Sequence, residues 1–128
     1  MKWNYVIPIE DKEVFEKIES LYGISVPEEL KNLVLNYNAG SPEKYHIMIN
    51  GNERVFGALL SFNKDDDDDF YTAFDNSTNK EMIPFGIDPF GNLFCVSTEN
   101  GHIYFYNHEI EIYEELDMDL IKFCDSMF

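Results

Sequence analysis

Two Asn-Gly dipeptides constrain the fold more than any other feature, because each one separates two short apolar runs. Asn50-Gly51 lies between the runs at 46–50 and 54–62, and Asn100-Gly101 lies between 93–97 and 103–106. Asn and Gly both tolerate the positive φ angles of a type I′ turn, whose twist matches that of two antiparallel strands. Each dipeptide therefore predicts an antiparallel hairpin.

Helical periodicity occurs on both sides of these hairpins. The segments with apolar residues at helical spacing are residues 10–22, 27–38, 67–75 and 117–127. Further strands are expected at residues 82–85 and 109–112. Gly23 fits the end of the first helix and Pro27 the start of the second. The order predicts one α+β domain over residues 1–128. We expect a single antiparallel meander sheet flanked by N-terminal helices, a short middle helix and a C-terminal helix.

The charge balance narrows the choice of partners. The chain carries 25 Asp and Glu against 9 Lys and Arg, a formal net charge of −16. Because 45% of its residues are hydrophobic, the chain can still form a folded core. Such a surface repels phosphate, so neither nucleic acid nor an anionic membrane is an expected partner. It attracts basic proteins and accelerates their association, although solubility alone also explains an acidic surface.

Cysteine usage and the N-terminal segment bear on the compartment. Cys95 and Cys124 lie in apolar runs, which predicts two reduced, buried thiols and no disulfide framework. The N-terminal segment has no signal-peptide pattern, and no apolar run is long enough to span a bilayer. The expected compartment is therefore the cytoplasm.

Two acidic clusters are the candidate partner-binding sites. The first cluster consists of Asp65, Asp66, Asp67, Asp68 and Asp69. It lacks the glycine and the terminal glutamate of an EF-hand, so it is either a solvated loop or a contact patch for Lys and Arg. The second cluster consists of Glu109, Glu111, Glu114 and Glu115, followed by Asp117 and Asp119. The two aspartates suit the first turn of the closing helix, which leaves the four glutamates as a second candidate interface.

Aromatic and histidine residues complete the list of candidates. Tyr104 and Tyr106 share one face of a predicted strand, where they either fill the core or act as aromatic anchors for a partner. The three histidines, His46, His102 and His108, match no zinc motif, and no catalytic motif is present. No metal, cofactor or enzymatic activity is expected. A carboxylate-based enzyme or a ligand-binding domain stays as a less supported alternative.

Several segments together resemble one known family. Residues 83–95 read Ile-Pro-Phe-Gly-Ile-Asp-Pro-Phe-Gly-Asn-Leu-Phe-Cys, and residues 103–109 form an apolar strand that ends in His-Glu. Upstream, residues 23–27 read Gly-Ile-Ser-Val-Pro and residues 37–40 read Tyr-Asn-Ala-Gly. In this order the segments resemble the SUKH superfamily, the Knr-like domain, with Ala39 in place of a glycine of the family pattern.

The resemblance implies a protein that works by binding. Most small bacterial members are immunity proteins of polymorphic or contact-dependent toxin systems, which block a cognate toxin domain, commonly a nuclease. We therefore expect an immunity protein, as a monomer or weak homodimer, with a non-toxin regulatory binding module as the alternative. The residues of the family signature are Pro84, Phe85, Gly86, Asp88, Gly91, Asn92, His108 and Glu109. Their turn and strand chemistry marks them as mainly structural.

Overall fold

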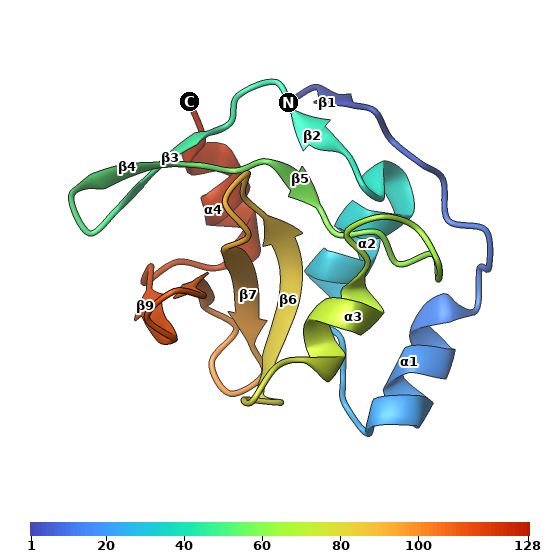
Figure 1. The fold of residues 1–128 in the computed structure, drawn as a ribbon. Coiled ribbons are helices and arrows are strands. Elements are labelled where there is room, and N and C mark those ends of the chain that lie inside the picture. The colour runs from blue at the N-terminus through green and yellow to red at the C-terminus, as the bar shows by residue number, and fades with distance from the viewer.

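The computed structural model describes all residues from Met1 to Phe128 and contains four helices and nine strands (Figure 1). The helices are α1 Val14–Tyr22, α2 Glu28–Tyr37, α3 Phe70–Asp75 and α4 Leu120–Ser126. The strands are β1 Trp3–Asn4, β2 Ser41–Pro42, β3 His46–Ile49, β4 Asn52–Val55, β5 Ala58–Leu59, β6 Met82–Ile87, β7 Leu93–Ser97, β8 Ile103–Asn107 and β9 Ile112–Glu115. None of the helices has the length and apolar character needed to cross a membrane.

The predicted α+β class is confirmed, and the main sheet has five antiparallel strands in the order β5-β6-β7-β8-β9. One detail differs, because β1 pairs with β2 and β3 with β4 in two separate small sheets. The run expected as one strand over 54–62 breaks at Gly57, whose N–H donates to the Ile87 carbonyl at 3.0 Å. A Cβ at this glycine would lie 2.7 Å from that carbonyl oxygen. The chain thus crosses from the hairpin to the main sheet where only glycine fits.

Both Asn-Gly dipeptides lie in the predicted hairpin turns, with different loop lengths. Asn50 and Gly51 alone connect β3 and β4, and both have positive φ, 50° and 82°. The second connection is longer, because β7 ends at Ser97 and β8 begins at Ile103. In that loop Gly101 adopts the left-handed conformation, with a φ of 72°.

Three helices begin later than expected, because an aspartate forms a turn ahead of each. The carboxylate of Asp11 accepts the N–H of Glu13 at 2.9 Å, and α1 begins at Val14. The carboxylate of Asp69 accepts the N–H of Thr72 at 2.7 Å as the N-cap of α3. For α4, expected from residue 117, the carboxylate of Asp119 accepts the N–H of Lys122 at 2.8 Å, and the helix begins at Leu120. Short polar side chains favour such local bonds over continued helix, so the apolar periodicity alone places these boundaries too early.

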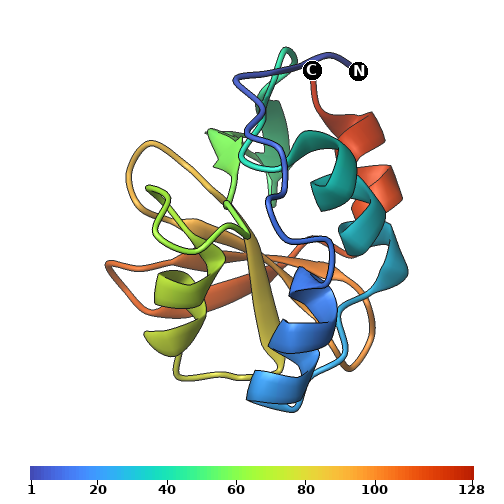
Figure 2. The ribbon, with the colours of Figure 1, turned by 90° about the vertical axis from the view of Figure 1, so that its right-hand side faces the viewer.

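One face of the main sheet packs on the helices and forms the core. Phe94 of β7 is fully buried, and its ring centroid lies 5.0 Å from Phe56, 5.3 Å from Phe105 and 5.5 Å from Phe123 of α4. Figure 2 shows α1, α2 and α4 on one side of β6 and α3 on the other. The phenylalanines therefore fill the space between the sheet and the helices, and we call this side of the sheet the core face.

Asn38, at the end of α2, joins segments that are far apart in the sequence. Its Nδ2 donates to the Ile7 carbonyl at 2.9 Å and to the Ser61 hydroxyl at 3.1 Å, and its Oδ1 accepts the N–H of Phe62 at 2.7 Å. The Ser61 hydroxyl donates in turn to Asp66 at 2.7 Å. Asn38 is almost completely buried, so these bonds replace those that water would otherwise make.

Candidate functional site

The other face of the main sheet carries tyrosines in place of phenylalanines. Tyr106 of β8 pairs with Tyr113 of β9, and their ring centroids are 4.5 Å apart. Tyr104 lies on the same face, between Cys95 of β7 and Glu115 of β9. The tyrosines are half-buried and lie outside the hydrophobic core. We call the surface formed by Leu93, Cys95, Tyr104, Tyr106 and Tyr113 the tyrosine face.

A groove of about 490 Å³ lies between the tyrosine face and α3. Its floor includes Leu93, Cys95, Tyr106 and Tyr113. One wall is α3 with the preceding Asp68 and Asp69, and the other includes Gly91 and His108. None of the lining residues is Lys or Arg. The groove has the size of a site for one large side chain or a short peptide segment.

The floor of the groove is uncharged at neutral pH. Burial raises the pKa of the Tyr113 hydroxyl above its ordinary value, so this group stays a neutral hydrogen-bond donor. Burial also raises the pKa of the Cys95 thiol, which keeps it protonated and unreactive. Both cysteines are free, as predicted, with Cys95 buried and Cys124 half-buried. Negative charge is therefore confined to the walls of the groove.

The signature turn at residues 88–92 borders the groove and is held by its own side chains. The buried carboxylate of Asp88 accepts the N–H of Phe90 at 2.9 Å and the N–H of Asn92 at 2.8 Å. The Asn92 amide also donates to Asp88 at 2.9 Å. Gly91 has a φ of 88°. The predicted turn at Asp88 and the positive φ of Gly91 are both confirmed, and the Asp88 and Asn92 side chains are directed to the backbone.

His108 connects this turn to the end of β8 through hydrogen bonds. Its backbone N–H donates to Oδ1 of Asn92 at 3.1 Å, and its Nε2 lies 2.7 Å from the Phe90 carbonyl oxygen. Because a carbonyl only accepts, Nε2 carries the proton, and in the neutral ring Nδ1 is left as an acceptor. The imidazole packs on Gly91, where an added Cβ would lie 3.4 Å from Nε2. The neighbouring Glu109 is exposed.

The remaining signature residues shape the main sheet. Pro84 lines the groove, and Phe85 is buried in the core face. The pairing of β6 with β7 shifts by one residue between Pro84 and Gly86, as a β-bulge does. A Cβ at Gly86 would collide with the ring of Phe56, so the missing side chain makes room for this core phenylalanine.

The aspartate loop, residues 64–69, divides between structural and exposed carboxylates. Asp66 accepts from Ser61, and Asp69 caps α3, so two of the five predicted contact residues hold the loop. Asp65, Asp67 and Asp68 are exposed. None of the five aspartates forms an ion pair. Of the run, only Asp68 and Asp69 line the groove.

The four glutamates of the second cluster do not form one patch. Glu109 and Glu111 are exposed in the turn between β8 and β9, where Glu111 has a φ of 56°. This turn occupies most of the strand expected at 109–112, and β9 begins only at Ile112. Glu114 lies on the opposite side of β9 from Tyr113 and accepts from Nδ2 of Asn50 at 2.9 Å. It therefore connects the main sheet to the β3–β4 hairpin.

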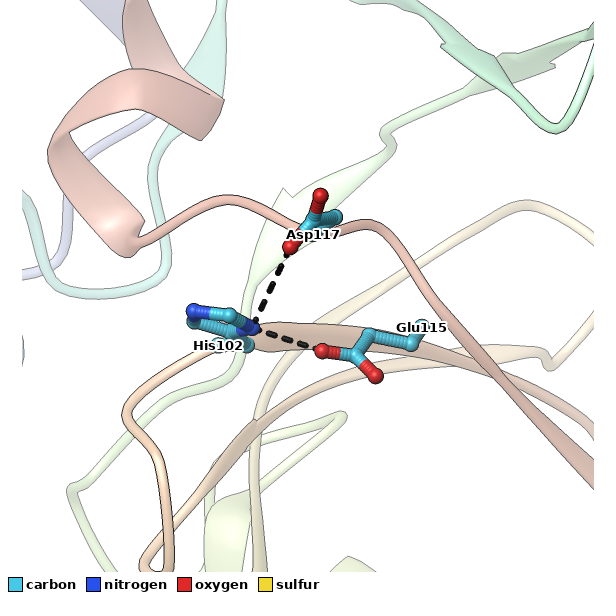
Figure 3. A group of neighbouring side chains, drawn as sticks. All are labelled: His102, Glu115 and Asp117. Atoms are coloured by element: carbon cyan, nitrogen blue, oxygen red, sulfur yellow. Dashed lines mark hydrogen bonds and ion pairs between the residues drawn. The ribbon is translucent and has the colours of Figure 1, made fainter.

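Glu115 belongs to a cluster that the sequence did not predict (Figure 3). Nδ1 of His102 lies 2.6 Å from Oε2 of Glu115 and 3.8 Å from Oδ1 of Asp117. Glu115 pairs with Tyr104 across the ladder, and His102 precedes Tyr104 by two residues, so both extend the tyrosine face. Tyr113 was missed as well. Its signal was present in the chain as an alternation with Glu114, but only the register of β8 with β9 brings it beside Tyr106.

The chain as a whole matches one family description. The SMI1 / KNR4 family (SUKH-1) matches residues 9–126, which include all four helices and the complete main sheet. No curated protein matches the chain, and no solved structure does. The family match agrees with the resemblance carried by residues 83–95 and 103–109. The chain therefore belongs to the SMI1 / KNR4 family (SUKH-1).

Proposed function

We propose that this protein is an immunity protein that binds a cognate toxin domain with a basic surface, such as a nuclease, and blocks it without catalysing a reaction. The arrangement of charge around the groove supports this proposal most directly. The chain contains no Lys or Arg between Lys80 and Lys122, a stretch that provides β6 to β9 and the signature turn. Carboxylates on this side of the molecule are therefore left without basic neighbours along the chain.

Charge explains how the partner is attracted. The exposed carboxylate of Asp68 lines the groove, those of Asp65 and Asp67 lie in the same loop, and those of Glu109 and Glu111 follow His108, which lines the groove. A nuclease cleft presents Lys and Arg to phosphate groups, and these cations also attract a surface of fixed carboxylates. Occupation of the cleft by such a surface excludes the nucleic acid.

The groove explains how the partner is held once it has arrived. Tyrosines at the centre of an interface contribute much of the binding free energy, because they bury a large area at a low cost in conformational entropy. Tyr106 and Tyr113 provide such a centre, with acidic residues around it. A side chain of the toxin that enters the groove would contact an apolar floor and a carboxylate wall together.

The experiment is co-expression of this protein with the toxin domain encoded by the adjacent gene. We expect a stable complex, and we expect cells that produce the toxin domain to survive only when this protein is present. A test variant that combines Tyr106→Ala with Asp68→Asn should remain folded but lose protection. A wild-type protein that neither binds nor protects against that domain, but binds an endogenous non-toxin protein, would overturn the proposal in favour of the regulatory module.

A further inference from the structure

We infer that His102, Glu115 and Asp117 form a binding site for a divalent transition metal ion, with Zn²⁺ as the best-fitting ion. His102 precedes β8 and His108 follows it, so the site lies at the opposite end of β8 from His108, and it does not depend on the proposed immunity function. Its three donors come from the loop before β8, from the end of β9 and from the residues that follow β9. The three side chains thus converge on one point, as the ligands of a metal ion must.

The spacing of the donor atoms suits a small dication. Nδ1 of His102 is 2.6 Å from the Glu115 oxygen and 3.8 Å from the Asp117 oxygen, and all three donors lie within 4.8 Å of one another. Zinc takes nitrogen and oxygen ligands at about 2.0–2.2 Å, which places neighbouring donors of a tetrahedral site about 3.4 Å apart. The observed separations lie on both sides of this value. Small rotations of exposed side chains bring the donors to it.

A bulge in the backbone directs Asp117 to this point. The N–H of Ile103 donates to the Met118 carbonyl at 2.8 Å, and the Ile103 carbonyl accepts the N–H of Leu116 at 2.9 Å. Leu116 and Met118 therefore both bond to one residue of β8, and Asp117 protrudes between them with a φ of 55°. Because Ile103 follows His102 directly, the bulge fixes the Asp117 backbone beside the imidazole.

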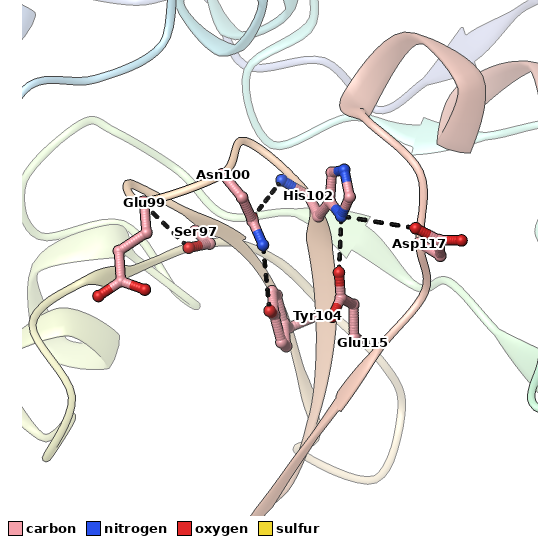
Figure 4. Close-up of polar contacts among 7 residues, drawn as sticks. All are labelled: Ser97, Glu99, Asn100, His102, Tyr104, Glu115 and Asp117. Carbon is pink, nitrogen blue, oxygen red and sulfur yellow. Dashed lines mark hydrogen bonds and ion pairs between the residues drawn. The ribbon is translucent and has the colours of Figure 1, made fainter.

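Neighbouring groups hold the backbone positions that carry the other two donors (Figure 4). Oδ1 of Asn100 accepts the N–H of His102 at 2.9 Å, and the Asn100 amide lies 3.4 Å from the Tyr104 hydroxyl. Glu115 is held in the β8–β9 ladder opposite Tyr104. The His102 side chain is nevertheless 34% exposed, so an ion can reach Nδ1 from solvent.

The charges at the site favour a metal over the ion pair alone. A protonated His102 balances one carboxylate, and no Lys or Arg pairs with either Glu115 or Asp117. A dication balances both carboxylates and displaces the proton from Nδ1. The imidazole nitrogen selects transition ions over Ca²⁺ and Mg²⁺, which prefer oxygen ligands only. Three protein ligands leave coordination positions open for water or for a side chain of a partner.

The test is titration of the full-length protein with ZnCl₂, followed by calorimetry and by the ¹⁵N resonances of the histidine rings. We expect one site per chain, release of protons, and a selective shift of the His102 Nδ1 resonance. The His102→Ala variant should bind Zn²⁺ at least about tenfold more weakly. Asp117→Asn keeps the tolerance for positive φ and should also weaken binding, while the matched control His46→Ala should bind as the wild type does.

Three results would overturn the inference. The first is equal Zn²⁺ affinity for the wild type, Asp117→Asn and His102→Ala. The second is Ca²⁺ binding as tight as Zn²⁺ binding, because carboxylates alone would then explain it. The third is a shift of the His46 or His108 resonances in place of His102. If His102→Ala does not fold, Asp117→Asn and the ring resonances of the wild type decide the outcome.

Discussion

The same strands contribute residues to both faces of the main sheet, but the residues on the two faces differ in burial and chemistry. Along β7 and β8 the core face presents Phe94 and Phe105, and the residues next to them, Cys95 and Tyr106, lie on the tyrosine face. The phenylalanines are fully buried among other rings, whereas Tyr106 is half-buried beside a groove. A hydroxyl on an otherwise similar ring marks the difference, because it needs a polar partner or water.

Because of this difference, we expect the core face to determine the stability of the fold and the tyrosine face to determine the binding of a partner. The core face removes large apolar surfaces from water within one chain and thereby stabilises the fold. The tyrosine face leaves part of its aromatic surface exposed and has uncompensated carboxylates around it. Exposed aromatic surface with an acidic rim contributes little to folding, but it is suited to a basic partner. Substitutions on the two faces should therefore change different measurements.

The largest expected effect is on the core face. The Phe94→Ala variant should lose about 3–5 kcal/mol of the free energy of unfolding, because it leaves a cavity between Phe56, Phe105 and Phe123. Urea unfolding followed by circular dichroism measures this loss. Tyr104→Ala on the opposite face should lose much less, and equal losses for the two variants would show that the faces do not differ in this way.

The next effect concerns affinity. We expect Tyr106→Ala to weaken binding of the toxin domain by about 2 kcal/mol, roughly thirtyfold, with a smaller change in the unfolding free energy. Calorimetry with the purified toxin domain gives the number. Tyr45→Ala is the matched control, because Tyr45 is 46% exposed and lies outside the tyrosine face. If the Tyr45 variant loses as much affinity as the Tyr106 variant, the groove is not the centre of the interface.

A smaller effect concerns the association rate. The Asp67→Asn and Asp68→Asn double variant should associate several-fold more slowly at low salt, with a weaker salt dependence and a nearly unchanged dissociation rate. Stopped-flow fluorescence resolves the two rates. A double variant with the same change in charge, Glu16→Gln and Glu29→Gln on α1 and α2, should associate as the wild type does. If both variants associate more slowly, the effect is due to the net charge of the protein and not to the position of the aspartates in the loop.

The smallest effect tests the end of the main sheet. Glu99 raises the pKa of Glu81, because its carboxylate accepts a hydrogen bond from the protonated Glu81 carboxyl group and also repels the charged form. Since the folded pKa lies above the unfolded one, protonation favours the fold, and stability rises as the pH falls through the folded pKa. Glu81→Gln should therefore have a slightly higher thermal midpoint at pH 7. The difference should vanish at about pH 3, and a lower midpoint for the variant at pH 7 would contradict this explanation.

Local signals in the sequence predicted the features that depend on neighbouring residues. The turns at Asn50-Gly51 and Asp88 follow from the conformations that these residues prefer, and the helices follow from apolar spacing. The break at Gly57 was not predictable in this way, because it depends on the Ile87 carbonyl thirty residues away. The separate β3–β4 sheet follows from that break.

Several residues of the candidate site could be predicted from the sequence, but their grouping in space could not. The acidic residues and Tyr106 were visible as composition and alternation, but their grouping depends on strand register. Register placed Tyr113 beside Tyr106 and Glu115 beside His102, and it moved Glu114 to the opposite side of β9. A side-chain period of two means that one residue of offset changes the face of every neighbour, so chain spacing alone could not assign these carboxylates.

The amide of Asn38 has a consequence for how the binding surface is assembled. Through Ser61 and Asp66 it links the end of α2 to the loop that carries the exposed aspartates. The shape of that loop therefore depends on the N-terminal half of the chain, although the groove floor is built from the C-terminal half. A substitution of Asn38 should therefore change the shape of the aspartate loop, and with it the affinity for a partner, even if that partner makes no contact with α2.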